Sequence, residues 1–434
     1  MTTVAEVRLW GRTIGAVAYE DGARAADFQY APEFIDSGIQ VAPMMMPLAA
    51  DTYRFPELSW QSFHGLPGML ADSLPDTFGN AVIDAWLSSE GRQPGSWNPV
   101  ERLCYTGTRG MGALEFRPAI GPKSRTASRI HVDRLVELAA EVLLHRDGFI
   151  VSLADKEKES ALRDILRVST SAGGARAKAI VAWNRETNEV RSGQVSAGRG
   201  FTYWVLKFDG VAGNRDKELA DPLGYGAIEY AYHRMAIAAG ITMAECRLLE
   251  EDGRRHFMTR RFDRTDAGGK VHLQSLGALM HYDYNMAGAY SYEQALQTIR
   301  RLGLGMEDIE QQFRRMVFNI VGRNQDDHVK NIAFLMDKAG NWSLAPAFDM
   351  TYSYQPTGIW TSRHQMSMNG KRDEFNLEDF RACARSASMK RGRAETIIAE
   401  VHQVVAHWRD FADDVGVKPE QRDRIQTALR LQAF

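Results

Sequence analysis

The feature that most constrains the fold of this chain is an abrupt change of residue pattern in its last third. Apolar side chains recur at helical spacing from Ile309 to Ile320, and the predicted helix ends at Gly322. Of the nine residues 323–331, eight are polar or charged, and the apolar run 332–335 that follows is typical of a buried strand. A polar loop in this position commonly carries functional groups, whereas an ordinary surface turn is the alternative interpretation.

The composition is that of an ordinary soluble globular protein. With 434 residues, of which 44% are hydrophobic and 25% charged, the chain can form two or three domains and is neither disordered nor fibrous. A formal net charge of −2 provides no general attraction to nucleic acid or to a membrane. The three cysteines lack Cys-x-x-Cys spacing, which argues against a structural zinc site or a disulfide framework. No apolar stretch could span a bilayer, so we expect a cytoplasmic protein without membrane contact.

Local patterns predict an α+β protein built from three successive parts. A β-rich N-terminal part is followed by a mixed part and then by a helical part. Strands are predicted at 178–183, 201–208 and 244–262, and helices at 225–239, 290–321 and over most of 376–434. The predicted domains are residues 1–120, 121–265 and 266–434.

Asp326 and Asn331 in the polar loop, together with Asp349, have the layout that phosphoryl transfer requires. A predicted hairpin over 332–345 returns the chain so that Asp349 lies beside Asn331. In such a site the first aspartate orients the attacking hydroxyl and accepts its proton, while the asparagine and the second aspartate hold Mg²⁺ through hard oxygens. The spacing from Asp326 to Asn331 equals that of a protein-kinase catalytic loop.

A kinase also needs a lysine on a buried strand, and Lys207 suits that role. It lies in the strand 202–208, which is apolar on both faces. An unpaired buried ammonium would be costly, so Lys207 needs an acidic or phosphate partner, and Glu229 on the following helix is the candidate. The alternative is that Lys207 ends the strand and extends to water.

A glycine-rich segment at 169–178 precedes the first predicted strand of the mixed part. Its small residues would let backbone N–H groups approach phosphates closely. The segment has neither the Walker A nor the GxGxxG pattern, and a simple β-turn is the alternative interpretation.

Seven segments of the chain, in this order, match a known family. They are LADSLPDTFGNAVIDAWL, GMGALEF, SAGGARAKA, VLKFD, MTRRFDR, GRNQDDHVKN and LAPAFDM, and they cover nearly the whole chain. On these motifs the chain resembles HipA-type toxins, the serine/threonine kinases of type II toxin–antitoxin modules. The resemblance implies a bilobal, protein-kinase-like (HipA-like) fold with a small β-rich N-terminal subdomain and a helical C-terminal lobe, and a requirement for ATP and Mg²⁺.

The resemblance also assigns roles to individual residues. Asp326 corresponds to the catalytic aspartate, Asn331 and Asp349 to the Mg²⁺ ligands, and Lys207 to the lysine that contacts the phosphates. The remaining expected nucleotide contacts are Gly173, Gly174, Ala175 and Lys178 in the glycine-rich segment, Phe262 and Asp263 at adenine and ribose, and His328 and Asn331 beside the nucleotide. The chain departs from the family at Arg260, where members often have glutamate.

Ser171 aligns with the serine that the family autophosphorylates, and Ser169 is a second candidate. A phosphate there would add about −1.5 to −2 charge and would expel or reorder a loop that otherwise covers the ATP phosphates. The alternative for both hydroxyls is a capping role in the local backbone.

The family's usual partner is a small helix-turn-helix antitoxin of the HipB type, which also represses the operon. Contact with operator DNA is therefore expected chiefly through the antitoxin. The basic cluster 390–393 is a candidate for direct phosphate contact, with a solvated loop as the alternative. Protein substrates of the family include aminoacyl-tRNA synthetases. Two other readings of the chain are a catalytically silent module that binds an antitoxin and operator, and a small-molecule kinase on the same scaffold.

Overall fold

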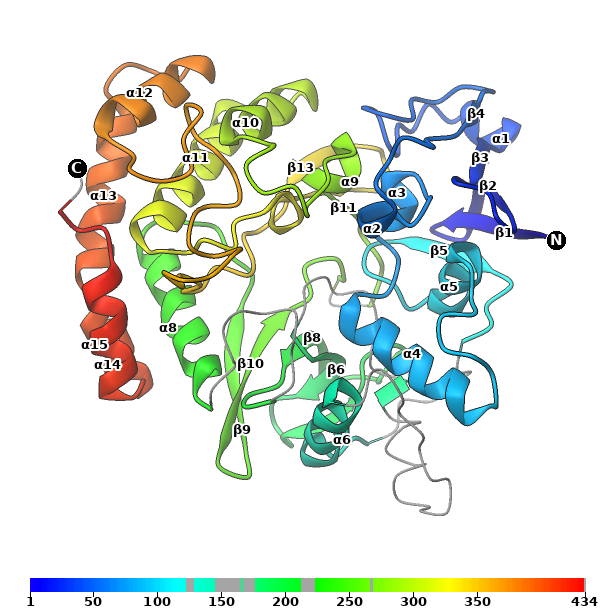
Figure 1. Ribbon diagram of the computed structural model, residues 1–434, viewed down its shortest axis with the longest axis horizontal. Coiled ribbons are helices and arrows are strands. Elements are labelled where there is room, and N and C mark those ends of the chain that lie inside the picture. The colour runs from blue at the N-terminus through cyan, green and yellow to red at the C-terminus, as the bar shows by residue number, and fades with distance from the viewer. Residues whose placement is uncertain (122–128, 145–164, 167–175, 212–222, 266–267, 433–434) are drawn as a thin grey trace.

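The computed structural model describes residues 1–121, 129–144, 165–166, 176–211, 223–265 and 268–432. Over these residues the chain forms three antiparallel sheets and a C-terminal group of helices (Figure 1). The N-terminal sheet and the helices α13–α15 lie at opposite ends of the molecule (Figure 1). No helix in the described part is long and apolar enough to cross a membrane.

The N-terminal part is built on a five-stranded sheet in the order β4-β3-β2-β1-β5. Its strands are β1 (Thr2–Leu9), β2 (Arg12–Glu20), β3 (Asp27–Tyr30), β4 (Thr52–Tyr53) and β5 (Leu114–Arg117). Its helices are α1 (Pro32–Ile35), α2 (Trp60–Phe63), α3 (Gly68–Ala71), α4 (Thr77–Ser89) and α5 (Pro99–Thr106). Alternate residues such as Ala5, Val7 and Leu9 are buried, because successive side chains of a strand point to opposite faces.

The middle part carries a second sheet in the order β7-β6-β8-β10-β9. Its elements are α6 (Val132–Leu144), β6 (Lys178–Asn184), β7 (Glu189–Ser192), β8 (Phe201–Lys207), α8 (Tyr225–Ala238), β9 (Cys246–Glu251) and β10 (Arg254–Arg260). The strands predicted at 178–183 and 201–208 and the helix predicted at 225–239 are therefore present at the expected positions.

The core of the middle part extends across the predicted boundary at residue 120. Apolar residues of α4, among them Phe78, Val82 and Ile83, pack in one cluster with α6 and with strands β6 and β8. The cap of α4 is Asp76, whose carboxylate accepts a 2.7 Å hydrogen bond from the Gly79 N–H. The division into 1–120, 121–265 and 266–434 stays a prediction, but α4 belongs with the second core by its packing.

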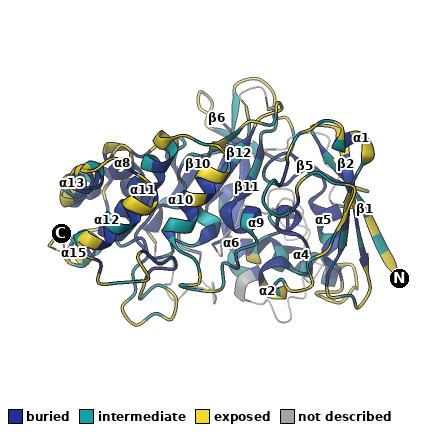
Figure 2. Ribbon diagram, turned by 90° about the horizontal axis from the view of Figure 1, so that it is seen from above, coloured by how far each residue is buried: buried dark blue, intermediate teal, exposed yellow. Residues whose placement is uncertain are grey.

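The C-terminal part combines a small sheet, in the order β11-β12-β13, with a group of packed helices. Its elements are β11 (His272–Ser275), α9 (Leu276–Met280), α10 (Tyr292–Arg301), α11 (Met306–Val321), the 3₁₀ turn η1 (Val329–Asn331), β12 (Ala333–Met336), β13 (Trp342–Leu344), α12 (Leu377–Ser386), α13 (Arg393–Ala406), α14 (Trp408–Val415) and α15 (Pro419–Ala428). The helices turn exposed stripes outward and bury the opposite face, as amphipathic helices do (Figure 2).

Helix α8 joins the middle part to the C-terminal part. Its apolar residues Ile228, Tyr232 and Met235 belong to the same core as α11 and α13. Its first turn lies against β10, where a Cβ added at Gly226 would come within 2.2 Å of the Arg255 carbonyl oxygen. A glycine is therefore needed for this close approach, which fixes the helix beside the sheet.

Candidate active site

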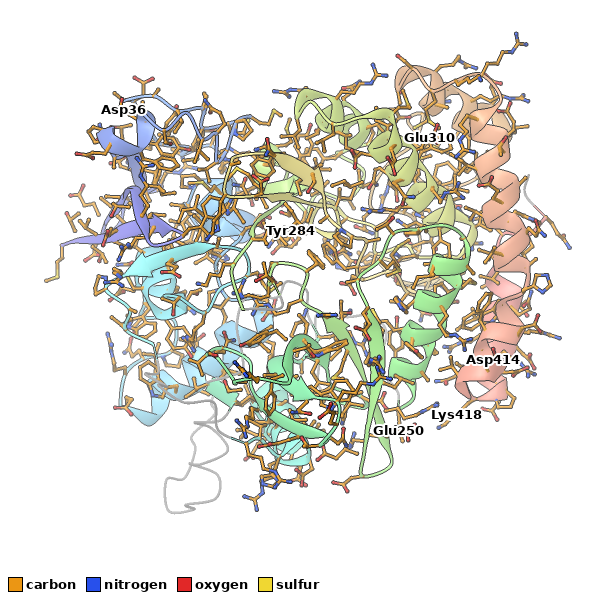
Figure 3. The ribbon with its side chains drawn as sticks, turned by 180° about the vertical axis from the view of Figure 1, so that it is seen from behind. Asp36, Glu250, Tyr284, Glu310, Asp414 and Lys418 are labelled. Atoms are coloured by element: carbon orange, nitrogen blue, oxygen red, sulfur yellow. The ribbon has the colours of Figure 1, made fainter. Side chains whose placement is uncertain are left out.

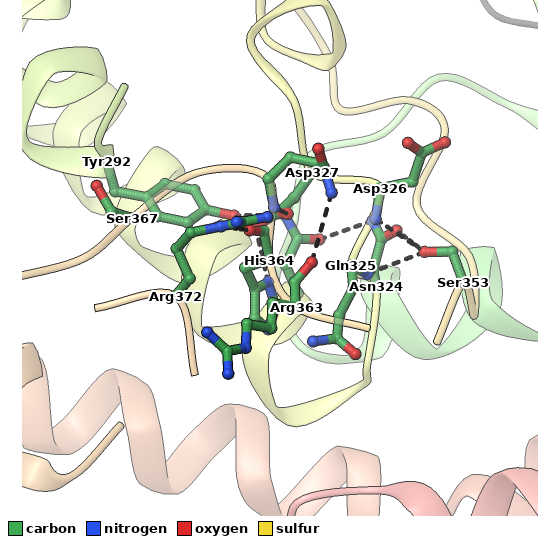
Figure 4. Close-up of polar contacts among 12 residues, drawn as sticks. Tyr292, Asn324, Gln325, Asp326, Asp327, Ser353, Arg363, His364, Ser367 and Arg372 are labelled. Carbon is green, nitrogen blue, oxygen red and sulfur yellow. Dashed lines mark hydrogen bonds and ion pairs between the residues drawn. The ribbon is translucent and has the colours of Figure 1, made fainter. Parts of the chain in front are cut away.

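Ser353 holds the backbone of the polar loop after α11 in place through hydrogen bonds. The Ser353 hydroxyl accepts hydrogen bonds from the Gln325 N–H at 2.9 Å and the Asp326 N–H at 3.0 Å, and it donates to Asn324 Oδ1 at 2.9 Å (Figure 4). The peptide of Asp326 is thereby fixed, while its side chain remains 34% exposed. A carboxylate held this way can meet a hydroxyl brought from solvent.

Asn331 lies close to Asp326, as the sequence spacing predicted. Its amide nitrogen donates a 2.8 Å hydrogen bond to the Asp326 carbonyl oxygen. A side-chain amide that donates through nitrogen keeps its oxygen as a potential metal ligand. The turn η1 makes this contact possible because it brings Asn331 back over the loop before β12 begins.

Asp349 follows the hairpin of β12 and β13, and its side chain contacts Lys207 on strand β8 of the second sheet. Its backbone φ is +56°, a conformation that aspartate tolerates better than most residues. Its carbonyl oxygen lies 3.5 Å from Asn324 Nδ2, and its carboxylate pairs with the Lys207 ammonium. Asp349 thus links the polar loop to strand β8.

Lys207 is nearly enclosed and is paired with carboxylates, as predicted. Its Nζ lies 2.5 Å from Glu229 Oε1, and its side chain is 10% exposed. Burial alone would lower the pKa of Lys207, but the facing carboxylates of Asp349 and Glu229 offset this and raise it above the ordinary value. The ammonium is therefore charged at all physiological pH values. The second oxygen of Glu229 binds Arg176 Nη1 at 2.8 Å, a contact that the sequence gave no reason to expect.

Lys178 is the direct cross-strand partner of Lys207 in the pairing of β6 with β8. It is buried, and its Nζ lies 3.9 Å from Asp76 Oδ2 at the cap of α4. Burial raises the pKa of Asp76 even though Lys178 acts in the opposite direction. Lys178 therefore faces α4 in this structure, and its expected contact with a nucleotide stays a prediction.

Asp209, the last residue of the VLKFD motif, holds the start of α8. Its carboxylate accepts hydrogen bonds from the Gly224 N–H at 3.0 Å and from the Gly226 N–H at 3.4 Å. Its own N–H donates to His256 Nδ1 at 2.9 Å. The residue thus positions the helix that carries Glu229. Sequence reasoning did not assign it a role, although its place directly after the strand was a usable signal.

Phe262 and Asp263 have different environments. The Phe262 ring lies 5.7 Å from the ring of Phe348, next to Asp349 in the chain. Asp263 has no exposed surface, because its carboxylate is held by Arg261 and Arg264.

The Asp263 carboxylate also accepts a 2.7 Å hydrogen bond from the Gly112 N–H in the N-terminal part. Burial would raise the pKa of Asp263, but the guanidinium groups of Arg261 and Arg264 hold it well below the usual range. This enclosed carboxylate ties the N-terminal part to the segment after β10. The expected contacts of Phe262 with adenine and of Asp263 with ribose stay predictions.

Arg260, the departure from the family pattern, is directed to Glu245. Its backbone N–H donates to the Glu245 carbonyl oxygen at 2.8 Å, and its guanidinium lies 3.4 Å from the Glu245 carboxylate. The substitution is thus accommodated by a pairing between the end of β10 and the segment before β9.

His328 lies next to Asp326, with Nε2 3.9 Å from Asp326 Oδ1. Its ring centroid is 6.0 Å from that of Tyr284, over which Lys330 Nζ lies at 4.4 Å. Tyr284 is near the middle of the molecule, between the N-terminal part and the helical part (Figure 3). His328 and Lys330 of the polar loop therefore both lie against Tyr284.

Asp327 is the residue of this loop that sequence reasoning missed. Its carboxylate accepts hydrogen bonds from Tyr292 at 2.5 Å, His364 at 2.8 Å and the Gln365 N–H at 2.8 Å (Figure 4). Burial alone would raise the pKa of Asp327, but His364 and Tyr292 hold it below the ordinary value. Only the spacing to Asn331 distinguished Asp326 from Asp327, and no sequence signal showed that the second aspartate is buried.

The hard oxygens of Asn331 and Asp349 fit a magnesium ion by their chemistry. The described residues contain no group of three or more His, Cys, Asp or Glu that could hold a metal ion alone. Phosphate oxygens and water would therefore have to complete the coordination, as is usual for Mg²⁺. Gly173, Gly174, Ala175, Ser169 and Ser171 lie outside the described residues.

Two family models match the chain. The HipA N-terminal domain matches residues 5–117, and the HipA-like C-terminal domain matches residues 170–408. The chain belongs to the HipA family. Its HipA-like fold is supported by the HipA structure solved with HipB and operator DNA from Shewanella oneidensis MR-1. The match covers 98% of this chain and 94% of the Shewanella chain, with a TM-score of 0.67 and 15% sequence identity.

A curated relative is the putative kinase Y4mE of Sinorhizobium fredii, which is 29% identical over 126 residues. The match covers 27% of this chain and 30% of that relative's length. The family matches and the structural likeness confirm the predicted α+β class, with its β-rich N-terminal part and helical C-terminal part.

Proposed function

We propose that this HipA-family protein is an ATP- and Mg²⁺-dependent serine/threonine protein kinase that acts as the toxin of a HipA/HipB-type module. The observation that carries the proposal is that one carboxylate connects two pairs of residues, which together have the groups that phosphoryl transfer needs. The pair Asp326 and Asn331 comes from the C-terminal part, the pair Lys207 and Glu229 from the middle part, and the Asp349 carboxylate connects them.

In the proposed mechanism Asp326 orients the substrate hydroxyl and accepts its proton. Lys207, kept charged and oriented by Glu229, supplies a fixed positive charge for the phosphate oxygens of ATP. Asn331 and Asp349 would hold Mg²⁺, which neutralises charge on the transferring phosphoryl group when it is bound. Phe262 would contact the adenine, with Gly173, Gly174, Ala175 and Lys178 as the proposed phosphate-binding element.

Autophosphorylation is the proposed control of this activity. Ser171, with Ser169 as the second candidate, lies in the glycine-rich segment that precedes β6. A phosphate in a segment that covers ATP would be repelled by the nucleotide phosphates, so modification would inhibit the kinase.

The proposed partner is a helix-turn-helix antitoxin of the HipB type. The HipA of Shewanella oneidensis was solved with HipB and operator DNA, and family membership supports a similar assembly for this chain. Operator contact would then be mainly indirect. The proposed substrate is a cytoplasmic protein, with an aminoacyl-tRNA synthetase as the leading candidate by family resemblance.

The test is intact mass spectrometry of the purified chain after incubation with Mg-ATP, followed by peptide mapping. We expect one or two added phosphates on Ser171 or Ser169, and none in Asp326→Ala. Binding of ATP without any phosphate transfer, to itself or to lysate proteins, would instead support a catalytically silent binding module. Transfer confined to a metabolite pool would support a small-molecule kinase.

A further inference from the structure

The C-terminal segment 428–432 lies against the start of the polar loop. The backbone N–H of Arg430 donates to the Val321 carbonyl oxygen at 3.0 Å, and Arg323 Nε donates to the Ala428 carbonyl oxygen at 2.8 Å. Val321 ends α11 and Ala428 ends α15, so each contact satisfies a carbonyl oxygen that has no partner within its own helix. The end of the chain is thereby joined to the residues that begin the polar loop.

The side chain of Arg430 makes a further contact with this region. It is 8% exposed, and its guanidinium pairs with the Asp373 carboxylate and lies 3.2 Å from His364 Nε2. Because a guanidinium can only donate hydrogen bonds, Nε2 acts as the acceptor and the ring hydrogen is on Nδ1. Nδ1 then donates to the Asp327 carboxylate at 2.8 Å (Figure 4). Arg430 thus fixes which nitrogen of His364 is the donor to Asp327.

The contact of Arg323 with the C-terminal segment continues to Asp326. The Arg323 carbonyl oxygen accepts a 3.2 Å hydrogen bond from the Ser353 N–H. The Ser353 hydroxyl in turn accepts a hydrogen bond from the Asp326 N–H at 3.0 Å. Two separate routes therefore connect the C-terminal segment to the two consecutive aspartates, one through Arg323 and Ser353 and one through His364.

These polar contacts account for much of the attachment of this end of the chain. Of the residues of α15, Ile425 is the buried one, and Leu429 follows it at 8% exposure. Apolar packing alone would allow such a segment to settle in several ways, whereas directional hydrogen bonds with satisfied partners specify one arrangement. The contacts of Arg430 are therefore suited to fix a geometry, and the geometry that they reach is that of the polar loop.

We infer that Arg430 is a positioning residue for phosphoryl transfer. Through His364 it holds Asp327, and with it the adjacent Asp326, in the place from which the Asp326 carboxylate orients the substrate hydroxyl. The Asp326 side chain is 34% exposed, so its position depends on its backbone, which these contacts hold. This inference rests on the proposed kinase function and adds to it a residue from the far end of the chain.

The experiment uses the full chain and three variants. Arg430→Met keeps most of the side-chain stem but removes the guanidinium. Arg430→Lys keeps a charge for Asp373 but lacks the paired N–H groups that serve Asp373 and His364 together. Arg314→Met is the matched control, because the Arg314 side chain is 10% exposed, pairs with a carboxylate and donates to the end of α8 and to α13.

Hydrogen exchange reports on the polar loop itself. Deuterium uptake is measured by mass spectrometry for the peptides that contain Gln325 and Asp326, whose N–H groups are bonded to Ser353. In Arg430→Met these groups should exchange roughly 10- to 100-fold faster, the effect of one lost buried hydrogen bond. Arg314→Met should keep the wild-type exchange, and Arg430→Lys should lie between wild type and Arg430→Met.

The rate of autophosphorylation at a series of Mg-ATP concentrations separates kcat from KM. In Arg430→Met kcat should fall by up to about 100-fold, because a displacement of about 1 Å at a reacting group can cost that much. The KM for ATP should change little, since Lys207 and Glu229 belong to the middle part of the chain. Arg314→Met should keep the wild-type kcat. If wild type modifies lysate proteins but not itself, their labelling supplies the rates.

Four results would overturn the inference. One is a folded Arg430→Met with wild-type exchange at Gln325 and Asp326. Another is faster exchange there with the wild-type kcat. A third is an equal loss of kcat in Arg314→Met, which would show that the loss of any buried arginine has the same effect. If Arg430→Met does not fold, Arg430→Lys decides, and wild-type exchange and kcat in that variant are the fourth.

Failure of the proposed function gives a different result. Wild type would then transfer phosphate neither to itself nor to lysate proteins, and the role of Arg430 in catalysis would fall with the kinase. The exchange comparison needs no phosphate transfer, so it would still show whether the C-terminal segment holds the polar loop.

Discussion

The carboxylate of Asp327 accepts a 2.8 Å hydrogen bond from His364, and both side chains are enclosed in the interior. The other ring nitrogen of His364 lies 3.2 Å from Arg430 near the C-terminus. Arg430 also pairs with Asp373. A chain of polar contacts therefore runs from the C-terminal segment to the residue beside the proposed catalytic aspartate. The two neighbouring aspartates have opposite environments, since the Asp326 side chain is 34% exposed and the Asp327 side chain is buried.

This contrast gives the first prediction. Asp327→Ala removes the acceptor for Tyr292, His364 and the Gln365 N–H in the interior. We expect the free energy of unfolding to fall by about 3 kcal/mol, because buried donors lose their partner. Urea unfolding followed by circular dichroism measures this.

Asp326→Ala is the matched control, since it changes the adjacent residue. It should leave the unfolding midpoint nearly unchanged and reduce phosphoryl transfer by a factor on the order of 10² to 10⁴. Equal stability loss in the two variants, or activity retained in Asp326→Ala, would contradict these assignments.

The second prediction concerns Lys207. Lys207→Met keeps most of the volume of the side-chain stem but removes the charge that faces Glu229 and Asp349. We expect phosphoryl transfer to fall roughly 100-fold or more, because a fixed charge at the transferring group is lost. Transfer of labelled phosphate from ATP is the measurement.

Lys270→Met is the comparison variant, because Lys270 also pairs with a carboxylate, Glu115, at 2.7 Å. That pair joins the N-terminal part to the segment before β11. Activity should be largely retained in Lys270→Met. Equal activity loss in both variants would show that Lys207 acts only through folding.

The third prediction is a loss of stability in mild acid that arises from buried histidines. Burial lowers the pKa of His256 to about 4, and the Asp209 N–H donates to its Nδ1, so the folded protein holds this ring neutral. An unfolded chain binds the proton near pH 6.5. The contribution of the neutral His256 ring to the free energy of unfolding is therefore fully present above about pH 6.5. It is lost as the pH falls toward 4, and about 2 kcal/mol of it is gone at pH 5.

Urea unfolding at pH 7.5 and pH 5 tests this in two variants. His256→Gln keeps an acceptor for the Asp209 N–H but cannot titrate. Between pH 7.5 and pH 5 its free energy of unfolding should therefore fall by about 2 kcal/mol less than that of wild type. His407→Gln changes an exposed histidine and should keep the wild-type dependence. An unchanged dependence in His256→Gln would contradict the prediction.

The strands, the main helices and the order of the three parts could be predicted because they depend on local periodicity. The hairpin before Asp349 is an example, because β12 and β13 lie within the predicted range 332–345. The pairing of Lys207 with Glu229 was also accessible, since a buried ammonium needs a partner wherever it lies.

The positions that could not be predicted depend on contacts between distant segments. Asp263 matches a motif, yet its carboxylate also accepts a hydrogen bond from the Gly112 N–H, which is 151 residues away in the sequence. Asp327 is buried by Tyr292 and His364, and neither lies in the polar loop. Whether a carboxylate faces solvent or the interior is decided by such partners, and a motif does not encode them.

The fourth prediction concerns Gly226 in the first turn of α8. Helix propensity alone would favour Gly226→Ala by about 1 kcal/mol. An alanine Cβ, however, would come within 2.2 Å of the Arg255 carbonyl oxygen, so the helix or the strand must shift. Such overpacking costs about 1–3 kcal/mol, which outweighs the propensity gain.

We therefore expect Gly226→Ala to lower the free energy of unfolding by up to about 2 kcal/mol in spite of the better helix former. Because α8 carries Glu229, a displaced helix should also weaken its contact with Lys207 and reduce kcat for autophosphorylation. Urea unfolding and the mass-spectrometric assay measure the two effects. A variant that is more stable than wild type and fully active would show that this close approach does not position the site.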